Sequence, residues 1–167
     1  MITTLLRLLG TPAPPKVFRF LFNLYPPYLG AGIKVEEISP DYKYLRARLK
    51  LRFYNRNYVG IQFGGSMFSM TDPHYMLLLI NNLGPDYIVL DKAANIDYIK
   101  PGKKDVIAEF RIDDALLNTV KEKTKDGDKY FFDLPVNIVD TDGQLIATVV
   151  KTLYVRKKPS GTSPTPK

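Results

Sequence analysis

One long apolar element lies in the middle of the chain and reads Gly65-Ser-Met-Phe-Ser-Met-Thr-Asp-Pro-His-Tyr-Met-Leu-Leu-Leu-Ile-Asn-Asn-Leu83, followed by Gly84-Pro85. Gly followed by Pro is a helix stop, because glycine suits the position after the last turn and proline cannot continue the helix. From Tyr75 to Leu83 apolar side chains cover most of the helix circumference, which is typical of a helix buried on nearly all sides. We therefore expect one central helix surrounded by other elements.

Residues on both sides of this helix show the period of two that is typical of half-buried strands. The clearest case runs from Tyr44 to Phe53, where apolar residues alternate with Arg and Lys. Four similar stretches follow the helix, at residues 87–99, 106–112, 129–139 and 145–156. Asp126-Gly127 and Asp142-Gly143 are turn sequences that join the last three stretches as antiparallel strands. Pro135 predicts an edge position or a bulge, because proline cannot donate to the ladder. The sequence thus predicts an α+β fold in which a curved antiparallel sheet wraps around one central helix.

The composition fits one globular domain and narrows the chemistry available to it. The chain has 167 residues, of which 45% are hydrophobic and 25% charged. It has no cysteine, which excludes disulfides, zinc-thiolate sites and a cysteine nucleophile. His74 is the one histidine, so a triad built on any other imidazole is excluded and a transition-metal site is not expected. Catalysis would then use carboxylates, hydroxyls, amides or the backbone, with no metal.

The amino end differs in composition from the middle of the chain. Two apolar stretches, residues 2–9 and 17–25, flank a proline-rich segment, and we predict residues 1–29 to be a helical extension. Neither stretch approaches the roughly 20 apolar residues of a spanning helix, and no basic residue precedes the first as in a signal peptide. The second stretch could pack on its own or a sister domain, lie on a membrane or cover a partner's groove. We expect a cytoplasmic protein without stable membrane insertion.

The net charge of +7 is the main argument for a polyanionic partner. Much of the excess lies in Arg156 and in residues 157–167, a segment rich in Pro, Ser and Thr that we predict to be a disordered basic tail. Single-strand binders place aromatic residues among their cations, and the basic face of the first strand offers only Tyr44 and Tyr54. We therefore expect a solvated face or a subunit contact, and no nucleic acid. The cations of this face, in the main domain of residues 30–156, are Arg46, Arg48, Lys50 and Arg52.

Two features near the start of the central helix could carry chemistry. The pair Gly64-Gly65 opens the helix, where the first amides have no intrahelical acceptor and could bind an oxyanion. The same pair could simply allow a tight strand-to-helix turn. Asp72 lies in an otherwise apolar element, where an unpaired carboxylate is costly, and could be a nucleophile or a general base. Followed by Pro73, it could equally cap and restart the helix.

The stretch from Asn57 to Asp72 resembles the hotdog-fold thioesterases, in particular the phenylacetyl-CoA thioesterase-like group. Members of that group show an Asn, a His-Gly-Gly six residues later and an Asp seven residues after the second Gly. Asn57, Phe63-Gly64-Gly65 and Asp72 keep these spacings. The segment Asn95-Ile-Asp-Tyr-Ile-Lys-Pro-Gly102 is similar to the strand and turn that follow in the family. The resemblance covers about residues 30–156.

This resemblance implies an acyl-CoA thioesterase for which coenzyme A is part of the substrate and no further cofactor is needed. The amides of Gly64 and Gly65 would hold the thioester carbonyl, and Asp72 would activate water or attack directly. Asn57 would orient substrate or water, and Asp91 falls about where some relatives place a side chain that positions the water. Subunits would pair into one larger sheet, as a dimer or a dimer of dimers, with active sites at the interface.

One residue departs from the family pattern, because Phe63, preceded by Gln62, stands where the family has His. An imidazole donor is lost near the substrate. Either the backbone amides suffice for hydrolysis with altered specificity, or the pocket binds acyl groups without cleaving them. Beside the Pro-Gly turn, Lys100, Lys103 and Lys104 could meet the phosphates of coenzyme A or form a charged solvent turn.

Overall fold

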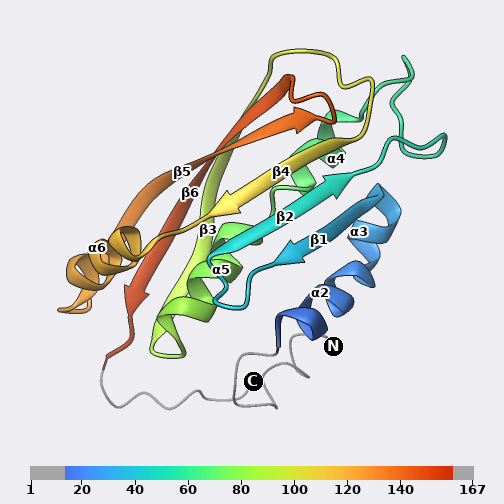
Figure 1. The fold of residues 1–167 in the computed structure, drawn as a ribbon. Coiled ribbons are helices and arrows are strands. Elements are labelled where there is room, and N and C mark those ends of the chain that lie inside the picture. Colours follow the sequence, from blue (N-terminus) through green and yellow to red (C-terminus); the bar gives the residue numbers. More distant parts are fainter. Residues whose placement is uncertain (1–13, 160–167) are drawn as a thin grey trace.

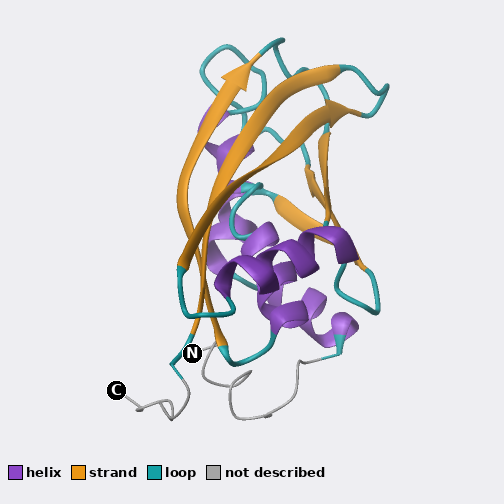
Figure 2. Ribbon diagram, turned by 90° about the vertical axis from the view of Figure 1, so that its left-hand side faces the viewer, coloured by secondary structure: helices purple, strands orange, loops and turns teal. Residues whose placement is uncertain are grey.

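The computed structural model describes residues 14–159, which form one curved antiparallel sheet and the helices packed against it (Figure 1). The strands are β1 (Ile33–Ile38), β2 (Tyr44–Leu49), β3 (Tyr87–Tyr98), β4 (Val106–Arg111), β5 (Lys129–Asp140) and β6 (Leu145–Lys157). Their order in the sheet is β1-β2-β4-β5-β6-β3. Figure 2 shows the long strands curving around the helices. The predicted α+β fold, with a curved antiparallel sheet around a central helix, is confirmed.

The central helix is interrupted, as in the alternative that the helix restarts after Pro73. It consists of α4 (Gly64–Ser69) and α5 (His74–Leu83), separated by residues 70–73. Pro73 lacks a backbone donor and its ring excludes a continuous helix through Asp72; the peptide bond between the two residues is cis. No side chain caps α5, so the capping role considered for Asp72 is wrong. Its carboxylate is therefore free for other contacts.

A further helix, α6 (Asp114–Thr124), connects β4 to β5 and was not predicted. The carboxylate of Asp113 accepts a hydrogen bond from the amide of Leu116 at 2.7 Å, which caps the first turn. Leu117 and Val120 bury one face of the helix. The Asp113 cap and the lysines of the last turn were the sequence signals for this helix.

Pro135 lies in β5 where one side of the strand has no ladder partner. It stands opposite Val150 of β6, whereas β4 pairs with β5 only at residues 138–140. No ladder bond on the β4 side is therefore lost to proline, which confirms the predicted edge-like position. The carbonyl of Pro135 instead accepts a hydrogen bond from the hydroxyl of Tyr75 at 2.7 Å, which ties α5 to the sheet.

The core lies between α5 and the inner face of the sheet. Leu78 and Leu79 of α5 and Phe110 of β4 are fully buried. The ring of Phe110 meets the ring of His74 edge-to-face, with centroids 4.7 Å apart, and the ring of Tyr75 at 5.1 Å. His74 is thus a packed core residue at the start of α5.

The amino-terminal helices α2 (Pro15–Asn23) and α3 (Pro26–Ala31) lie beside the edge strand β1 (Figure 1). The side-chain amide of Asn23 donates to the carbonyl of Val35 at 3.0 Å and accepts from its amide at 2.8 Å. Phe18 and Tyr28 are buried in the same core as the sheet. The extension therefore covers this edge of the sheet and prevents further pairing there.

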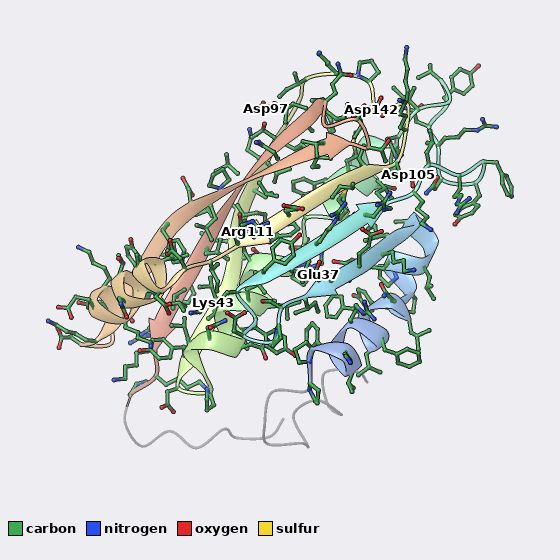
Figure 3. All side chains as sticks on the ribbon, viewed as in Figure 1. Glu37, Lys43, Asp97, Asp105, Arg111 and Asp142 are labelled. Carbon is green, nitrogen blue, oxygen red and sulfur yellow. The ribbon has the colours of Figure 1, made fainter. Side chains whose placement is uncertain are left out.

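Two of the four cations of the predicted basic face, Arg46 and Arg48, are paired with acids of neighbouring segments. Arg48 lies 2.5 Å from Glu36 and 3.7 Å from Asp105, and Arg46 lies 3.3 Å from Glu36. Figure 3 shows acids and bases interspersed over these strands, with Lys43 near one end of β2 and Asp105 near the other. This face therefore offers a polyanion less positive charge than the sequence alone suggests.

No helix within residues 14–159 has the length and apolar character needed to cross a bilayer. Residues 1–13, which hold the first predicted apolar stretch, and residues 160–167, which hold most of the predicted tail, lie outside the described residues.

Candidate functional site

A cavity of about 480 Å³ opens between the amino-terminal helices, the break in the central helix and the strands β3 and β6. Aromatic side chains form its walls: Tyr25 and Tyr28 from α3 and the residue before it, and Phe68 from α4. Its charged residues are Asp72, Asp91, Lys92 and Lys151. The amino-terminal extension thus builds part of the cavity that contains the predicted acid Asp72.

Lys151 joins the two acids of the cavity. Its ammonium nitrogen Nζ lies 2.8 Å from Oδ1 of Asp72 and 3.3 Å from Oδ1 of Asp91. The side chain of Lys151 is 4% exposed and that of Asp91 20%, whereas that of Asp72 is 55% exposed. Asp72 is therefore the member of the cluster that a bound molecule would meet first.

Secondary structure explains how three distant residues meet. Asp72 lies in the break between α4 and α5, and the hydroxyl of Tyr28 donates a hydrogen bond to its backbone carbonyl. Lys151 lies in the middle of β6 opposite Ala94 of β3. Asp91 precedes an irregularity of β3 at which Lys92 has no partner on β6, and such a bulge turns the neighbouring side chains.

The two acids bind protons with different affinity. Burial by itself raises the pKa of Asp72, but the hydrogen bond and positive charge of Lys151 outweigh it and hold this pKa below its ordinary value. Burial raises the pKa of Asp91 to about 6. The positive charge of Lys151 opposes this shift, whereas the hydrogen bond to Asp72 and the negative charge of Asp72 add to it. The cluster therefore keeps Asp72 ionised in weak acid while Asp91 holds the remaining proton.

Asp91→Asn is expected to stabilise the fold at pH 8 and to change its stability little at pH 4. Because the pKa of Asp91 is raised in the folded state, its contribution favours folding at low pH and is lost as the pH rises from about 4 to about 6. Urea unfolding midpoints of both proteins across this range provide the measurement. Asp133→Asn, at an exposed acid of β5, is the matched control. An equal midpoint for Asp91→Asn and the wild type at pH 8 would contradict the expectation.

Some of the other predicted residues line a second cavity of about 360 Å³, whereas Phe63, Gly65, Lys103 and Lys104 do not. Its lining includes Asn57, Gln62, Gly64 and Lys100, together with Tyr98, and neither Asp72 nor Asp91. Within one chain, the structure therefore does not bring the predicted acid and the Gly-Gly pair into one pocket.

Asn57 and Gln62 make contacts within their own loops. Oδ1 of Asn57 accepts hydrogen bonds from the amides of Val59 and Ile61, at 3.1 and 3.2 Å. Gln62 is 1% exposed, and its side-chain amide donates to the carbonyls of Leu49 and Lys104. Both side chains thus hold the approach to α4 in place.

Aromatic rings occupy the space beside the Gly-Gly pair. A Cβ at Gly65 would lie 2.6 Å from the ring of Phe63, and one at Gly64 would lie 2.8 Å from the hydroxyl of Tyr98. Phe63 is 54% exposed, so this ring lies at the surface next to the first turn of α4. Glycine is thus needed here for close approach of side chains.

The three lysines of the Pro-Gly turn have different surroundings. Lys104 forms an ion pair with Asp142 at the protein surface. Lys100 lines the second cavity, and Lys103 is exposed. Two of the three predicted phosphate contacts therefore have no ion pair among the described residues.

Lys151 was missed in the sequence, although a signal for it exists. The inward positions of β6 read Ala147, Val149, Lys151, Leu153 and Val155. A lysine at a position where the period of two demands an apolar residue indicates a buried acidic partner.

Within residues 14–159 no group of three or more His, Asp or Glu is arranged to hold a metal ion.

Comparison with protein families identifies the chain. The profile of a family described as a domain of unknown function, DUF4442, matches residues 15–155. The chain belongs to this family. The DUF4442 match includes α2 and α3, which the resemblance noted in the sequence did not cover. Comparison with curated proteins gives no sequence match.

Solved structures share the fold of this DUF4442 chain. A protein of unknown function from Pseudomonas aeruginosa, described as a probable thioesterase, has a TM-score of 0.77 at 19% identity over 88% of this chain and 98% of its own. A protein of unknown function from Chlorobaculum tepidum has a TM-score of 0.67 at 16% identity over 86% and 94%. A thioesterase from Haemophilus influenzae has a TM-score of 0.61 at 12% identity over 86% and 91%. The chain therefore has the hotdog fold of these proteins.

Proposed function

We propose that the protein is an acyl-CoA thioesterase in which Asp72 activates the attacking water. The observation that carries the proposal is the exposed carboxylate of Asp72 at an aromatic cavity, held ionised by the buried Lys151. A general base must be ionised, within reach of water and next to a place for the substrate, and Asp72 meets these three requirements, while its lowered pKa reduces its strength as a base. Thioesterases with the same fold support the assignment.

In the proposed reaction, Asp72 accepts a proton from water while the oxygen of that water attacks the thioester carbonyl. The negative charge that develops on the carbonyl oxygen would be stabilised by the amides of Gly64 and Gly65, which open α4 without intrahelical acceptors. Collapse of this intermediate breaks the carbon–sulfur bond, and the proton held by Asp72 passes to the departing thiolate of coenzyme A. The acyl group leaves as a carboxylic acid, and no cofactor is consumed.

The proposal requires two copies of the chain, because Asp72 and Gly64 line different cavities in one copy. The sheet has two edges, and α2 and α3 cover β1. The other edge is β3, which has 12 residues and pairs with β6 alone. An unpaired edge of this length is a template for strand addition, so β3 pairing between copies would build the dimer. Asp72 of one copy would then act on an ester held by Gly64 and Gly65 of the other.

Coenzyme A would lie at the second cavity in this arrangement. Lys100 lines that cavity and Lys103 is exposed in the same turn, so their ammonium groups would meet the phosphates. Asn57, Gln62 and Phe63 would surround the thioester end of the ligand. The acyl group would extend past Asp91 toward the aromatic walls of the first cavity.

Hydrolysis of a panel of acyl-CoA esters tests the proposal directly. Short, long, branched and aromatic acyl groups are offered, and the free thiol released is measured. Asp72→Asn purified in the same way is the blank for thioesterases of the expression host. We expect turnover of at least one ester and a solution mass of a dimer or tetramer. A monomer without turnover of any ester would contradict the proposal.

The second candidate is a module that binds acyl groups without cleaving them. Phe63 favours it, because a phenyl ring in place of imidazole offers no hydrogen-bond donor beside the Gly-Gly pair. One oxyanion donor is worth roughly 2.7–4 kcal/mol of transition-state stabilisation in a known protease. Saturable binding of an acyl-CoA by calorimetry, without thiol release, would select this candidate.

Phe68→Ala is expected to shift the preference of the enzyme toward bulkier acyl groups. Phe68 is a wall of the first cavity, and removing its ring enlarges the space for the acyl chain. The ratio of kcat/KM for a bulky over a short ester should rise about 10- to 200-fold, the usual range for a change in an apolar pocket. Phe131→Ala, at a comparably exposed ring of β5 outside this cavity, is the matched control. The same ratio in both variants would show that the acyl group lies elsewhere.

A further inference from the structure

We infer that Lys151 is a positioning residue of the hydrolysis: its ammonium holds Oδ1 of Asp72 and keeps this carboxylate oriented toward the attacking water. The inference rests on the proposed function and adds to it a residue that is absent from the Asn, Gly-Gly and Asp pattern. Lys151 acts through Asp72 and does not touch the substrate.

The burial of Lys151 is the first argument. A lysine is seldom buried, because removing its charge from water is costly unless acids pair with it. Here the side chain is 4% exposed in the middle of β6, between Val149 and Leu153 of the same inward face. An apolar residue would fill this position at lower cost to the fold. The sequence instead places a buried cation in contact with the exposed carboxylate of Asp72. A need to hold that carboxylate ionised and oriented explains this choice.

The geometry of the carboxylates is the second argument. Nζ donates a hydrogen bond to Oδ1 of Asp72 at 2.8 Å and forms an ion pair with Oδ1 of Asp91 at 3.3 Å, so one cation is in contact with both acids. A carboxylate whose one oxygen is bound by a buried ammonium cannot rotate freely. Its second oxygen therefore keeps one direction, as a base must if a water molecule is to attack along a defined path.

Apart from the exposed Lys92, the other groups around the cluster are uncharged. From α3 the hydroxyl of Tyr28 binds the backbone of Asp72, and burial raises its pKa far above neutrality. From α5 burial lowers the pKa of His74 to about 3, against the opposing effect of Asp72, so this imidazole is neutral. Tyr25 and Lys92 lie at the cavity wall. Lys151 is therefore the cation in contact with both acids.

The consequence of removing Lys151 has a definite sign. Without the ammonium, burial and mutual repulsion of the two carboxylates remain, and both effects raise carboxyl pKa values. Asp72 would then be protonated at a higher pH, and the acid limb of the kcat/KM profile would move upward. An opposite charge at this distance usually lowers a carboxyl pKa by about 1–3 units, so we expect a shift of this size.

Lys151→Met is the decisive variant, measured between about pH 3 and 9 on the best ester of the panel, so that the range includes the low pKa of Asp72 in the wild type. We expect a lower kcat at pH 6, a KM within a few-fold of the wild type and an acid limb shifted by about 1–3 units. Lys151→Arg keeps the charge and should keep the limb near its original pH. Asp91→Asn in the Lys151→Met background removes the repulsion and should move the limb back. Lys43→Met breaks a surface ion pair of 2.7 Å with Asp114 and is the control.

A second readout separates this inference from the proposed function. Carbon-13 NMR of protein labelled at the aspartate carboxyl groups follows Asp72 and Asp91 without substrate, with Asp72→Asn and Asp91→Asn assigning the signals. If no ester is hydrolysed, the proposed function fails, and these titrations alone decide whether Lys151 holds Asp72 ionised. Lys151→Gln, a neutral side chain that keeps a hydrogen-bond donor, replaces Lys151→Met if the latter does not fold. An unchanged titration of Asp72, or a lower kcat with an unmoved acid limb, would overturn the inference.

Discussion

Asp72→Asn is expected to lower kcat for thioester hydrolysis by about 100- to 10,000-fold, the range that general-base catalysis supplies. Asparagine keeps the shape of the side chain but cannot accept a proton from water. The fold should tolerate the change, because no side chain caps α5 and 55% of the Asp72 side chain is exposed. KM should change little, since the aromatic walls of the cavity remain. Steady-state kinetics on the best ester of the panel measure both constants.

The control for this prediction is Asp133→Asn, which removes an exposed carboxylate that accepts a hydrogen bond from Thr152 at 2.6 Å. It should keep the full kcat. Binding of the same acyl-CoA to Asp72→Asn, measured by calorimetry, shows whether the cavity is intact. An unchanged kcat in Asp72→Asn would remove Asp72 from the reaction, whereas lost binding together with lost turnover would indicate a structural role.

The strands could be predicted because local alternation reports burial directly. The predicted strand from Tyr44 to Phe53 ends at Leu49 in the structure, whereas the predicted strands at 87–99, 106–112, 129–139 and 145–156 agree with it within two residues. The helix break was one of the alternatives that the sequence offered, because Pro73 cannot continue α4. A helix is excluded by a single backbone conflict, however apolar its residues are.

The charged cluster could be predicted only in part, because its members meet through the fold. Asp72 was identified from its apolar surroundings and its spacing from the Gly-Gly pair. Lys151 lies 79 residues further along, and alternation alone shows that it points inward but not toward which acid. The position of Tyr28 at the cavity likewise depends on tertiary packing, because it is set by how α3 packs beside β1. Local patterns give the orientation of a side chain, and tertiary packing gives its partner.

Phe110→Ala is expected to lower the free energy of unfolding by about 3–5 kcal/mol, the usual cost of removing a buried aromatic ring. Phe110 is fully buried, and its ring packs edge-to-face against His74 and Tyr75, so no neighbour can fill the cavity without moving α5. Urea unfolding measures the effect. Phe20→Ala, at a ring of α2 that is 62% exposed, should change the same free energy by less than about 0.5 kcal/mol. Similar small changes in both variants would contradict the packing of α5 against β4.

The contact between the rings of Phe110 and His74 connects the core to the candidate site. His74 follows Pro73 directly, so the ring of Phe110 supports the first turn of α5 and with it the break that presents Asp72. Phe110→Leu should lose less stability than Phe110→Ala, because more of the volume is kept. If its kcat falls at temperatures where the variant is fully folded, the core acts on Asp72 through the position of this turn. If kcat stays at the wild-type value, Lys151 and Tyr28 suffice to hold Asp72 in place.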